Sequence, residues 1–470
     1  MPNYMIKMAV AATTLALLSG CVKTQDVTPE IDALQSQFQD LDNSVAYRHA
    51  NEARWWTGFN DNQLNQLVRD GVAANRDLEA AGKRIQAAYQ RLGYEQAQYL
   101  PQGSVDGVVT WEGLDGNSSE SSFLGANTIW ELDLFGRISY LVDAAQADVM
   151  SATEYRRQVY VEVVSAVVES YLNWQGNTER YRIVSGQIAS LENSIQVLQA
   201  RVEEGISSTL DLHRTQAQLN QQEALLPAVE AALYRNRATL ATLLGVNPDR
   251  LELKPVNYGL AGNIHRPLEL TTPEKAVAQR PDIHIAMQRL IGQNALSNAA
   301  VASLYPSISL SGNAGILSES SSSWLQGDAA WSMTPRLSWS LLSLPALNAK
   351  AKAERSLTEA AYVDYEQTII NAIAESQAAL VDLLTSSEVV ESSESRLDHA
   401  SKALRQVQVM YEEGSVPYLE VLDARREALA AEGDASTSKT QMLVARVSAY
   451  RAFNGGWSQA AYFMETDSEQ

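Results

Sequence analysis

The sequence repeats one set of short motifs at a nearly constant distance. The offsets between paired motifs are 205, 205, 206 and 209 residues. The pairs are NRDLEAA (75–81) with RPDIHIA (280–286), AQYLP (97–101) with ASLYP (302–306), AVVES (166–170) with AIAES (372–376), and VEEGISSTLDLHRT (202–215) with YEEGSVPYLEVLDA (411–424). Four matches in order indicate a tandem duplication of a unit of about 200 residues. We therefore assign a first repeat to 21–262 and a second repeat to 263–470.

Each repeat carries two segments with the alternating pattern of a β-strand. The expected strands span about 103–112, 123–135, 307–317 and 329–341. Alternation over about ten residues with tryptophans toward the ends, such as Trp331 and Trp339, is typical of a transmembrane strand that faces lipid on one side. A half-buried strand in a soluble sheet alternates in the same way. The Ser-rich segments 117–122 and 318–323 are expected to form hairpin loops.

The rest of each repeat has the pattern of long helices. The expected helices span about 143–204, 210–245, 348–413 and 418–453. From Ala349 to Glu413 there is neither Gly nor Pro, the residues least compatible with a helix interior. Apolar or aromatic residues recur there at intervals of seven, at Leu383, Val390, Leu397, Leu404 and Tyr411. This spacing indicates supercoiled packing against neighbouring helices, whereas Pro227 predicts a kink or break in the 210–245 helix.

The N-terminus has the features of a bacterial lipoprotein signal. Residues 1–20 contain one basic residue, Lys7, and then an apolar run that is too short to span a bilayer. The tetrapeptide LSGC at 18–21 matches the lipobox, in which the cysteine becomes the lipid-bearing N-terminus. Because Cys21 is the single cysteine, an intramolecular disulfide and a cysteine-rich zinc site are excluded. The alternative is an ordinary signal peptide that a thiol happens to follow.

Charge and hydropathy restrict the possible partners. The net charge of −20, without a basic stripe to neutralise phosphates, argues against nucleic acid and against an anionic membrane surface. Outside the signal, no apolar run approaches the roughly eighteen residues that a membrane helix needs. The long helices are therefore expected to lie in water.

Four strands are too few to close a barrel by themselves. An open sheet edge cannot lie in lipid, because its backbone groups would stay without hydrogen bonds. If these are membrane strands, several chains must share one barrel. Two chains would give eight strands and an interior filled by side chains, whereas three would give twelve strands and room for a pore.

The sequence offers little support for an enzyme. The five histidines are scattered, without a pair at metal-ligand spacing on one helix: His49, His213, His265, His284 and His399. There is no G-x-S-x-G elbow, no Gly-rich phosphate loop and no C-x-x-C pair. We therefore predict a protein without catalytic activity, metal or cofactor, apart from the lipid on Cys21.

Six motifs taken together resemble one known family. They are WWTGFND (55–61), ELDLFGR (131–137), GISSTLD (205–211), QRPD (279–282), LYP (304–306) and GSVPYLEVLD (414–423). In this order and spacing the chain resembles the outer-membrane efflux proteins of the TolC type, in the lipoprotein branch that serves RND pumps. The resemblance covers essentially the whole mature chain. It implies a mostly α-helical fold with four strands per chain in a shared, trimeric, twelve-stranded membrane barrel, and long coiled helices that form a periplasmic tunnel.

The resemblance also implies a role for the duplicated acidic-glycine motif. In the family this stretch is a helix–turn–helix tip at the periplasmic mouth, so Gly205 and Gly414 are expected to lie in the tip turns. Two tips per chain would place six around the mouth, where adaptor proteins dock and the tunnel narrows. Trimerisation would bring the carboxylates of Glu420 and Asp423 together as an acidic constriction ring.

Family members hold the mouth shut with side-chain links between tips, and these carry over to Asp211 and Tyr411. Some relatives have an arginine two positions after the glycine of the second tip, where this chain has Val416. A salt bridge from that position to Asp211 is therefore impossible here. Glu420 and Asp423 also have a simpler interpretation, because acids near a helix N-terminus are common and stabilise the helix while facing solvent.

The resulting hypothesis is a non-catalytic exit duct in the outer membrane, anchored by its lipid. It would be a homotrimer that receives substrate from an inner-membrane RND-type transporter through a periplasmic adaptor. The alternative is a lipid-anchored envelope scaffold without a pore. A scaffold has no need for tryptophan-flanked alternating strands in both repeats, so the strands favour the duct.

Overall fold

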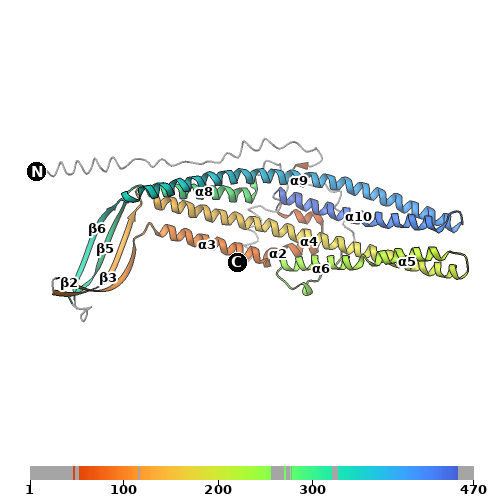
Figure 1. Cartoon of the computed structure of the whole chain (residues 1–470), viewed down its shortest axis with the longest axis horizontal. Helices are drawn as coiled ribbons and strands as arrows, with labels where there is room; N and C mark the ends of the chain where they lie inside the picture. Colours follow the sequence, from red (N-terminus) through yellow and green to blue (C-terminus); the bar gives the residue numbers. More distant parts are fainter. Residues whose placement is uncertain are drawn as a thin grey trace. The chain divides into compact units, whose positions relative to one another are not determined.

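The computed structural model describes residues 46–47, 52–114, 117–255, 269–270, 276, 278–319 and 327–453 (Figure 1). The predicted signal peptide at 1–20, the lipidation site Cys21 and the boundary between the repeats at 262–263 lie outside these residues. The main elements, in chain order, are η2 (Glu52–Phe59), α2 (Asn62–Ala74), α3 (Arg76–Ala97), β2 (Gln102–Leu114), β3 (Asn117–Leu132), α4 (Arg137–Glu203), α5 (Thr209–Glu223), α6 (Leu226–Leu243), α8 (Pro281–Ala302), β5 (Ser307–Ser318), β6 (Asp328–Ser338), α9 (Leu344–Glu412) and α10 (Tyr418–Ala452).

The four long strands form one antiparallel sheet in the order β2-β3-β5-β6. Its central pair, β3 with β5, joins the two repeats, and Gly125 lies opposite Gly315 in that pair. A Cβ added to Gly125 would come within 2.6 Å of the Ala314 carbonyl oxygen and of the Gly315 Cα, so the two strands approach closely there. Among the described residues, strands β2 and β6 have no neighbour on their outer sides, so the described sheet has two open edges.

Large apolar side chains stand exposed on both edge strands. Val105 and Trp111 of β2 are 78% and 71% exposed, and Trp331 and Met333 of β6 are 79% and 64% exposed. A strand face that is rich in tryptophan and aliphatic side chains but not covered by the chain itself matches the expected lipid-facing surface. The expected loop at 117–122 was wrong, because Ser118 to Ser122 pair in register with β2 as part of β3.

Each of the two longest helices is continuous. α4 has 67 residues and α9 has 69, which at 1.5 Å per residue makes each about 100 Å long. On the seven-residue stripe of α9, Leu383 and Val390 are 8% and 1% exposed, which confirms that the stripe is a packing surface. The expected single helix at 210–245 is divided into α5 and α6, with Pro227 in the first turn of α6.

Hydrogen bonds reproduce the duplication in detail. The indole Nε1 of Trp130 donates to the Tyr99 carbonyl at 2.8 Å, and the indole Nε1 of Trp339 donates to the Leu304 carbonyl at 3.1 Å. The two tryptophans are equivalent under the offset of 209, and the two acceptors are equivalent under the offset of 205. Each bond therefore fixes the end of a strand to the segment that enters the hairpin, once in each repeat.

The chain divides into two compact units, each built from both repeats. One contains 83–154 and 284–368, and includes the sheet; its helix core comprises Ala88, Leu92, Ala145 and Val149. The other consists of 31–82, 155–283 and 369–470, and it contains the ends of α4 and α9. Its largest core cluster joins η2, α2, α4 and α10, with the rings of Trp55 and Tyr450 stacked at 4.7 Å. Among the described residues, no helix has both the length and the hydropathy to cross a membrane.

Candidate gate at the helix tips

The two duplicated tips lie in the unit that contains the ends of α4 and α9. α4 is followed by Gly205 and α9 by Gly414, whose φ angles are +71° and +75°. A residue with a side chain rarely adopts this left-handed conformation, which explains why glycine occupies both positions. The expected tip-turn glycines therefore lie between two antiparallel helices, α4–α5 in the first repeat and α9–α10 in the second (Figure 1).

Both turns close with the same hydrogen bonds. The Ile206 amide donates to the Arg201 carbonyl at 2.8 Å, and the Ser415 amide donates to the Met410 carbonyl at 2.9 Å. Each glycine amide also donates to the carbonyl three residues earlier, at 3.0 Å. Together these bonds form a Schellman motif, which satisfies carbonyls at the end of a helix. The tips are consequently defined turns with fixed entry and exit helices.

The helices that leave the turns begin differently. In the first tip the Ser208 hydroxyl accepts a hydrogen bond from the Leu210 amide at 3.1 Å and caps α5. In the second tip Pro417 precedes α10 and provides no side-chain cap. Glu420 lies in the first turn of α10, where a negative charge interacts favourably with the helix dipole. The structure therefore supports the interpretation of Glu420 as an acid that faces solvent and stabilises the start of a helix.

A small apolar core joins the two tips. Its members come from α4, α5, α9 and α10, and they are Leu198, Leu212, Val407, Tyr411, Tyr418, Val421 and Leu422. Val421 and Leu422, at 3% and 5% exposed, occupy the inner face of α10. Glu420 and Asp423 flank this pair and are exposed. Burial of the apolar pair therefore fixes the outward direction of both carboxylates.

The predicted constriction residues have different surroundings in the single chain. Asp423 forms an ion pair with Arg426, one turn further along α10. Among the described contacts, the Glu420 carboxylate has no ion pair and no hydrogen bond. Sequence reasoning missed Arg426, although its position three residues after an aspartate on a helix is a recognisable signal. Because Arg426 offsets one of the two negative charges, Glu420 and Asp423 contribute less net negative charge at this end of α10 than two unpaired carboxylates would.

The predicted linking residues, Asp211 and Tyr411, do not form a hydrogen bond with each other within one chain. Asp211 is half-buried in the first turn of α5, and its carbonyl accepts a hydrogen bond from the Thr215 hydroxyl at 2.8 Å. The Tyr411 ring packs against Tyr418 with centroids 5.2 Å apart, and the Arg201 guanidinium carbon lies 5.2 Å from its centroid. A role of Asp211 and Tyr411 between chains stays a prediction. The contact with Arg201 was not expected from the sequence.

Polar contacts hold α9 and α10 together further from the tip. Arg396 of α9 forms ion pairs with Glu427 at 2.9 Å and Asp434 at 2.6 Å on α10. The hydroxyls of Ser393 and Ser438 are hydrogen-bonded at 2.7 Å. These contacts pair two further acids on the exposed side of α10 with a cation.

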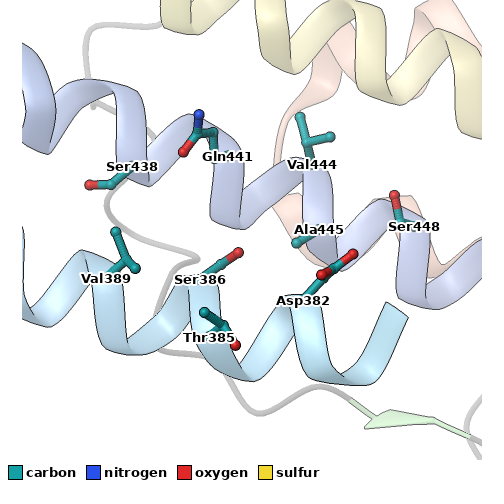
Figure 2. A pocket seen from close by; sticks show the side chains of 9 residues that line it. All are labelled: Asp382, Thr385, Ser386, Val389, Ser438, Gln441, Val444, Ala445 and Ser448. Carbon is teal, nitrogen blue, oxygen red and sulfur yellow. The ribbon is translucent and has the colours of Figure 1, made fainter. Parts of the chain in front are cut away.

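Beyond these contacts, α9 and α10 enclose a shallow groove of about 350 Å³ (Figure 2). It is lined by Asp382, Thr385, Ser386, Val389, Ser438, Gln441, Val444, Ala445 and Ser448. Most of these side chains are small or uncharged, and Asp382 is the one ionisable group among them. Across the described residues, no group of three or more His, Cys, Asp or Glu is arranged to hold a metal ion.

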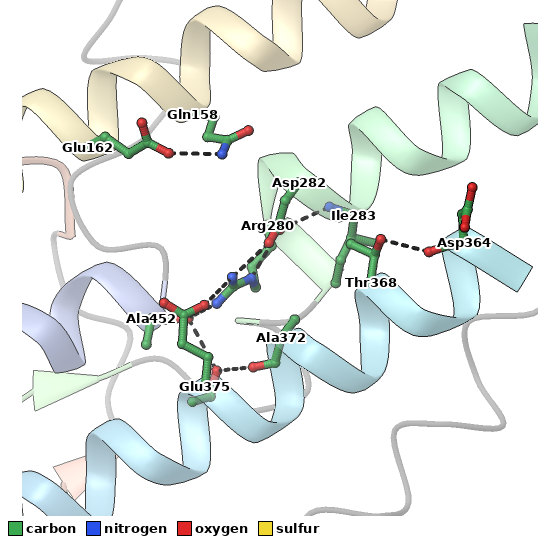
Figure 3. A network of polar contacts seen from close by, with 11 residues as sticks. Gln158, Glu162, Arg280, Asp282, Ile283, Asp364, Thr368, Ala372, Glu375 and Ala452 are labelled. Carbon is green, nitrogen blue, oxygen red and sulfur yellow. Dashed lines mark hydrogen bonds and ion pairs between the residues drawn. The ribbon is translucent and has the colours of Figure 1, made fainter. Parts of the chain in front are cut away.

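The QRPD motif anchors the far end of α10. The side chain of Arg280 is 11% exposed and pairs with Asp282 at 2.7 Å and Glu375 at 2.6 Å (Figure 3). Its guanidinium also donates to the Ala452 carbonyl, in the last turn of α10, at 3.0 Å. Burial opposes the charged form of Arg280, but the hydrogen bonds and charges of the two carboxylates outweigh this effect and raise its pKa. Arg280 therefore joins the ends of α8 and α10 to the middle of α9.

The WWTGFND motif ends in a second polar cluster. One carboxylate oxygen of Asp61 accepts from the Gln63 and Leu64 amides and caps α2, and the other accepts from the Tyr171 hydroxyl at 2.6 Å. The Gln175 amide donates to the same hydroxyl at 2.8 Å. Burial of Tyr171, together with its hydrogen bond to the Asp61 carboxylate and that charge, raises the pKa of the phenol above its ordinary value.

This architecture defines a class of protein: a duplicated chain with an open four-stranded sheet, an exposed apolar strand face and long helices that end in paired tips. The family model described as outer membrane efflux protein matches residues 67–246 and 272–455, one stretch in each repeat. The chain therefore belongs to the outer membrane efflux protein family. The predicted family, the mostly helical fold class and the outer-membrane location are confirmed.

The chain is similar to several named proteins of this kind along most of its length. It is 28% identical to the cation efflux system protein CusC of Escherichia coli O6:H1, over 94% of this chain and 97% of that protein. It is 26% identical to the probable outer membrane lipoprotein SilC of Salmonella typhimurium, over 95% and 98%. It is 25% identical to the toluene efflux pump outer membrane protein TtgF of Pseudomonas putida, over 86% of each.

Solved structures agree with these sequence comparisons. The outer-membrane channel OprN has a TM-score of 0.85 and 29% identity, covering 93% of this chain and 100% of that one. A structure of CusC has a TM-score of 0.81 and 25% identity, covering 92% and 100%. The chain is an outer membrane efflux channel, as the hypothesis of an exit duct predicted, and the scaffold alternative finds no support.

Proposed function

We propose that three copies of the chain form one passive exit duct. Each copy would contribute four strands to a twelve-stranded barrel, and the long helices would form the periplasmic tunnel. The observation that carries this proposal is the sheet with two open edges, β2 and β6, in a chain that belongs to an outer-membrane family. Closure requires further copies, and twelve strands leave room for a pore where eight would not.

The duct would act as the outer-membrane component of a tripartite pump. Its partners would be a periplasmic adaptor that docks at the tips and an inner-membrane RND-type transporter that supplies the energy. The names of the relatives, which describe parts of efflux systems and pumps, support this assignment. We further propose that the duct needs no cofactor and catalyses no reaction, and that a lipid on Cys21 anchors it, as the name lipoprotein for SilC supports.

The relatives are named for different cargoes, a cation in one case and toluene in another. Because ducts of one family are named for such different molecules, we propose that the duct itself has no pocket that selects the cargo. Selection of the cargo would therefore take place in the transporter, and the duct would contribute charge and width at its narrowest point.

We place that narrowest point at Glu420 and Asp423. Both carboxylates are exposed in the single chain and point away from the tip core. Trimerisation would bring six of them near one axis, where their combined negative charge should favour divalent cations. Because Arg426 pairs with Asp423, Glu420 should contribute more of the negative potential.

Planar-bilayer conductance of the purified lipoprotein tests this proposal. We expect small, cation-selective steps that a divalent cation blocks, and larger, less sensitive steps for Glu420→Ala/Asp423→Ala. Glu203→Ala/Glu204→Ala removes the same charge from exposed acids at the first tip and serves as the control.

Unchanged conductance, selectivity and block in the first double variant would contradict the constriction but leave the duct intact. A silent wild type with a conducting variant would mean a duct that is sealed at rest. No conductance from any form, after verified insertion of the trimer, would contradict the duct itself.

A further inference from the structure

The two tips of one chain meet through an aromatic ring and a cation. Tyr411 lies in the last turn of α9, and Arg201 lies in the last turn of α4. The guanidinium carbon of Arg201 is 5.2 Å from the centroid of the Tyr411 ring. A cation within about 6 Å of a ring centroid is attracted by the negative face of the ring. Both side chains are half-buried, which reduces the screening of this attraction by water.

The tip turns fix the backbone on both sides of this contact. The carbonyl of Arg201 accepts the closing hydrogen bond of the first turn from Ile206, and the carbonyl of Tyr411 accepts one from Gly414 at 3.0 Å. The Tyr411 ring also packs against Tyr418. The two partners are consequently positioned before they meet, so little side-chain freedom is lost on forming the contact.

The contact does not exist in duplicate. Under the offset of 209, Met410 occupies the position equivalent to Arg201, and Val202 occupies the position equivalent to Tyr411. The second pair has neither a cation nor a ring. The first repeat therefore contributes the cation and the second repeat contributes the ring. Because the two residues belong to different tips, their contact can hold the tips together.

The apolar core also joins the two tips, but the polar links that the family resemblance implies are missing within the chain. Val416 cannot form an ion pair, and the Asp211 carboxylate makes no hydrogen bond to the Tyr411 hydroxyl within the chain. Among the described residues, Arg201 has no ion pair that would compete for its guanidinium. The ring of Tyr411, rather than its hydroxyl, is the group that faces the first tip's cation.

We propose that the Arg201–Tyr411 contact holds the two tips of each chain together in the closed mouth and that opening of the duct breaks it. This inference rests on the proposed function as a gated duct. A cation–π contact at a partly exposed site shifts an equilibrium by about two- to fivefold, so three copies that open together should shift it by about tenfold or more.

Single-channel recording of the full lipoprotein trimer in planar bilayers tests the contact. We expect Arg201→Gln and Tyr411→Leu each to raise the ratio of open to closed time about tenfold or more, because each removes one partner. Tyr411→Phe keeps the ring and loses the hydroxyl, so its ratio should stay near that of the wild type. Arg201→Lys keeps a cation and should lie between the wild type and Arg201→Gln.

Arg214→Gln is the matched control for charge. Arg214 is exposed on α5, close to the same tip, and its loss changes the net charge equally without touching Tyr411. The double variant Arg201→Gln/Tyr411→Leu should open no more than the stronger single variant, because both changes break one contact.

Three results would overturn the inference: Arg201→Gln behaving like the wild type, Arg214→Gln opening the duct as much as Arg201→Gln, or Tyr411→Phe opening it as much as Tyr411→Leu. The last result would assign the link to the hydroxyl and a carboxylate such as Asp211. If the wild type and every variant fail to conduct after verified insertion, the proposed function itself fails. If the wild type conducts and its conductance changes in Glu420→Ala/Asp423→Ala, the proposed duct is supported. A negative result for the Arg201 and Tyr411 variants then contradicts only the proposed role of the Arg201–Tyr411 contact.

Discussion

Asn75 and Arg280 occupy equivalent positions in the two repeats, and each donates a hydrogen bond to the last turn of a helix. The Asn75 amide donates to the Leu243 carbonyl at 3.0 Å, and the Arg280 guanidinium donates to the Ala452 carbonyl at 3.0 Å. The two acceptors are themselves related by the offset of 209. The duplication has therefore preserved the position of a bond while the side chain that makes it has changed.

The individual site residues differ in how far the sequence could predict them. Glycine after a long helix and before a new one predicts a left-handed turn, and Gly205 and Gly414 adopt it. The contact between Arg201 and Tyr411 joins residues far apart in the chain, so it depends on how two helix ends pack, which no local pattern encodes. The role of Glu420 and Asp423 depends on copies of the chain that a single sequence does not place.

Tyr171 provides a prediction about alkaline pH. Its pKa is raised in the folded state, mainly by burial and then by Asp61, so the unfolded chain loses this proton first. The stability that the neutral phenol contributes is fully present below about pH 10 and falls as the pH rises further. We expect Tyr171→Phe to lose less stability above about pH 10 than the wild type does. Urea unfolding at a series of pH values, followed by circular dichroism, measures this slope.

Tyr234→Phe is the matched control, because Tyr234 is 58% exposed in the same unit. Its slope with pH should equal that of the wild type. If Tyr171→Phe and Tyr234→Phe behave alike, the cluster around Asp61 does not contribute to the alkaline loss of stability.

At the scale of elements, the sequence pattern predicted the two longest helices and the approximate positions of the four long strands. The segment 349–413, which lacks Gly and Pro, forms most of α9, and its counterpart in the first repeat, interrupted only by Gly176 and Gly186, forms most of α4. Segments with period-two alternation form β2, β3, β5 and β6. The Ser-rich composition of 117–122 predicts a loop, because serine favours turns. Its place in β3 is determined by pairing with β2, a tertiary effect that overrides local preference.

Replacing glycine with alanine should change the free energy of unfolding in opposite directions at two positions in the α9–α10 region. Gly414 has a positive φ, whereas Gly433 lies inside α10, and an added Cβ would meet nothing within 4 Å at either position. Gly414→Ala should cost about 1 kcal/mol, because alanine is strained in the left-handed conformation. Gly433→Ala should stabilise by about 0.5–1 kcal/mol, because alanine favours the helix.

Unfolding free energies of the two variants measure this difference, since neither change introduces a steric contact. Equal effects of the two substitutions would contradict the Schellman geometry assigned to the second tip.

At the scale of the whole molecule, the internal β3–β5 pairing predicts how two chains should pair. β2 and β5 are equivalent under the offset of 205, and β3 and β6 under the offset of 209. In the internal pair Gly125 lies opposite Gly315, and the equivalent positions are Thr334 on β6 and Thr110 on β2. If the duplication repeats the same geometry, Thr334 of one chain lies opposite Thr110 of the next.

Cysteine exchange tests this register. In Thr110→Cys/Thr334→Cys we expect oxidation to produce a covalent trimer on a denaturing gel, because residues directly opposite on neighbouring strands are close enough for a disulfide. The pair Thr110→Cys/Ser332→Cys, shifted by two residues, is the control and should cross-link poorly. Efficient cross-linking of the shifted pair alone would show that the intermolecular register differs from the internal one.

The β3–β5 pairing has a consequence for the history of the chain. A gene encoding one repeat would have produced a two-stranded subunit with a single tip, and six copies would have been needed for the same twelve strands. In such a hexamer all six tips carry identical side chains, so one substitution changes every one of them. After fusion of two such genes, a substitution in one repeat changes three of the six tips and leaves the other three unchanged. Ser208 in one tip and Pro417 in the other, and an arginine where its counterpart is a methionine, record that independence.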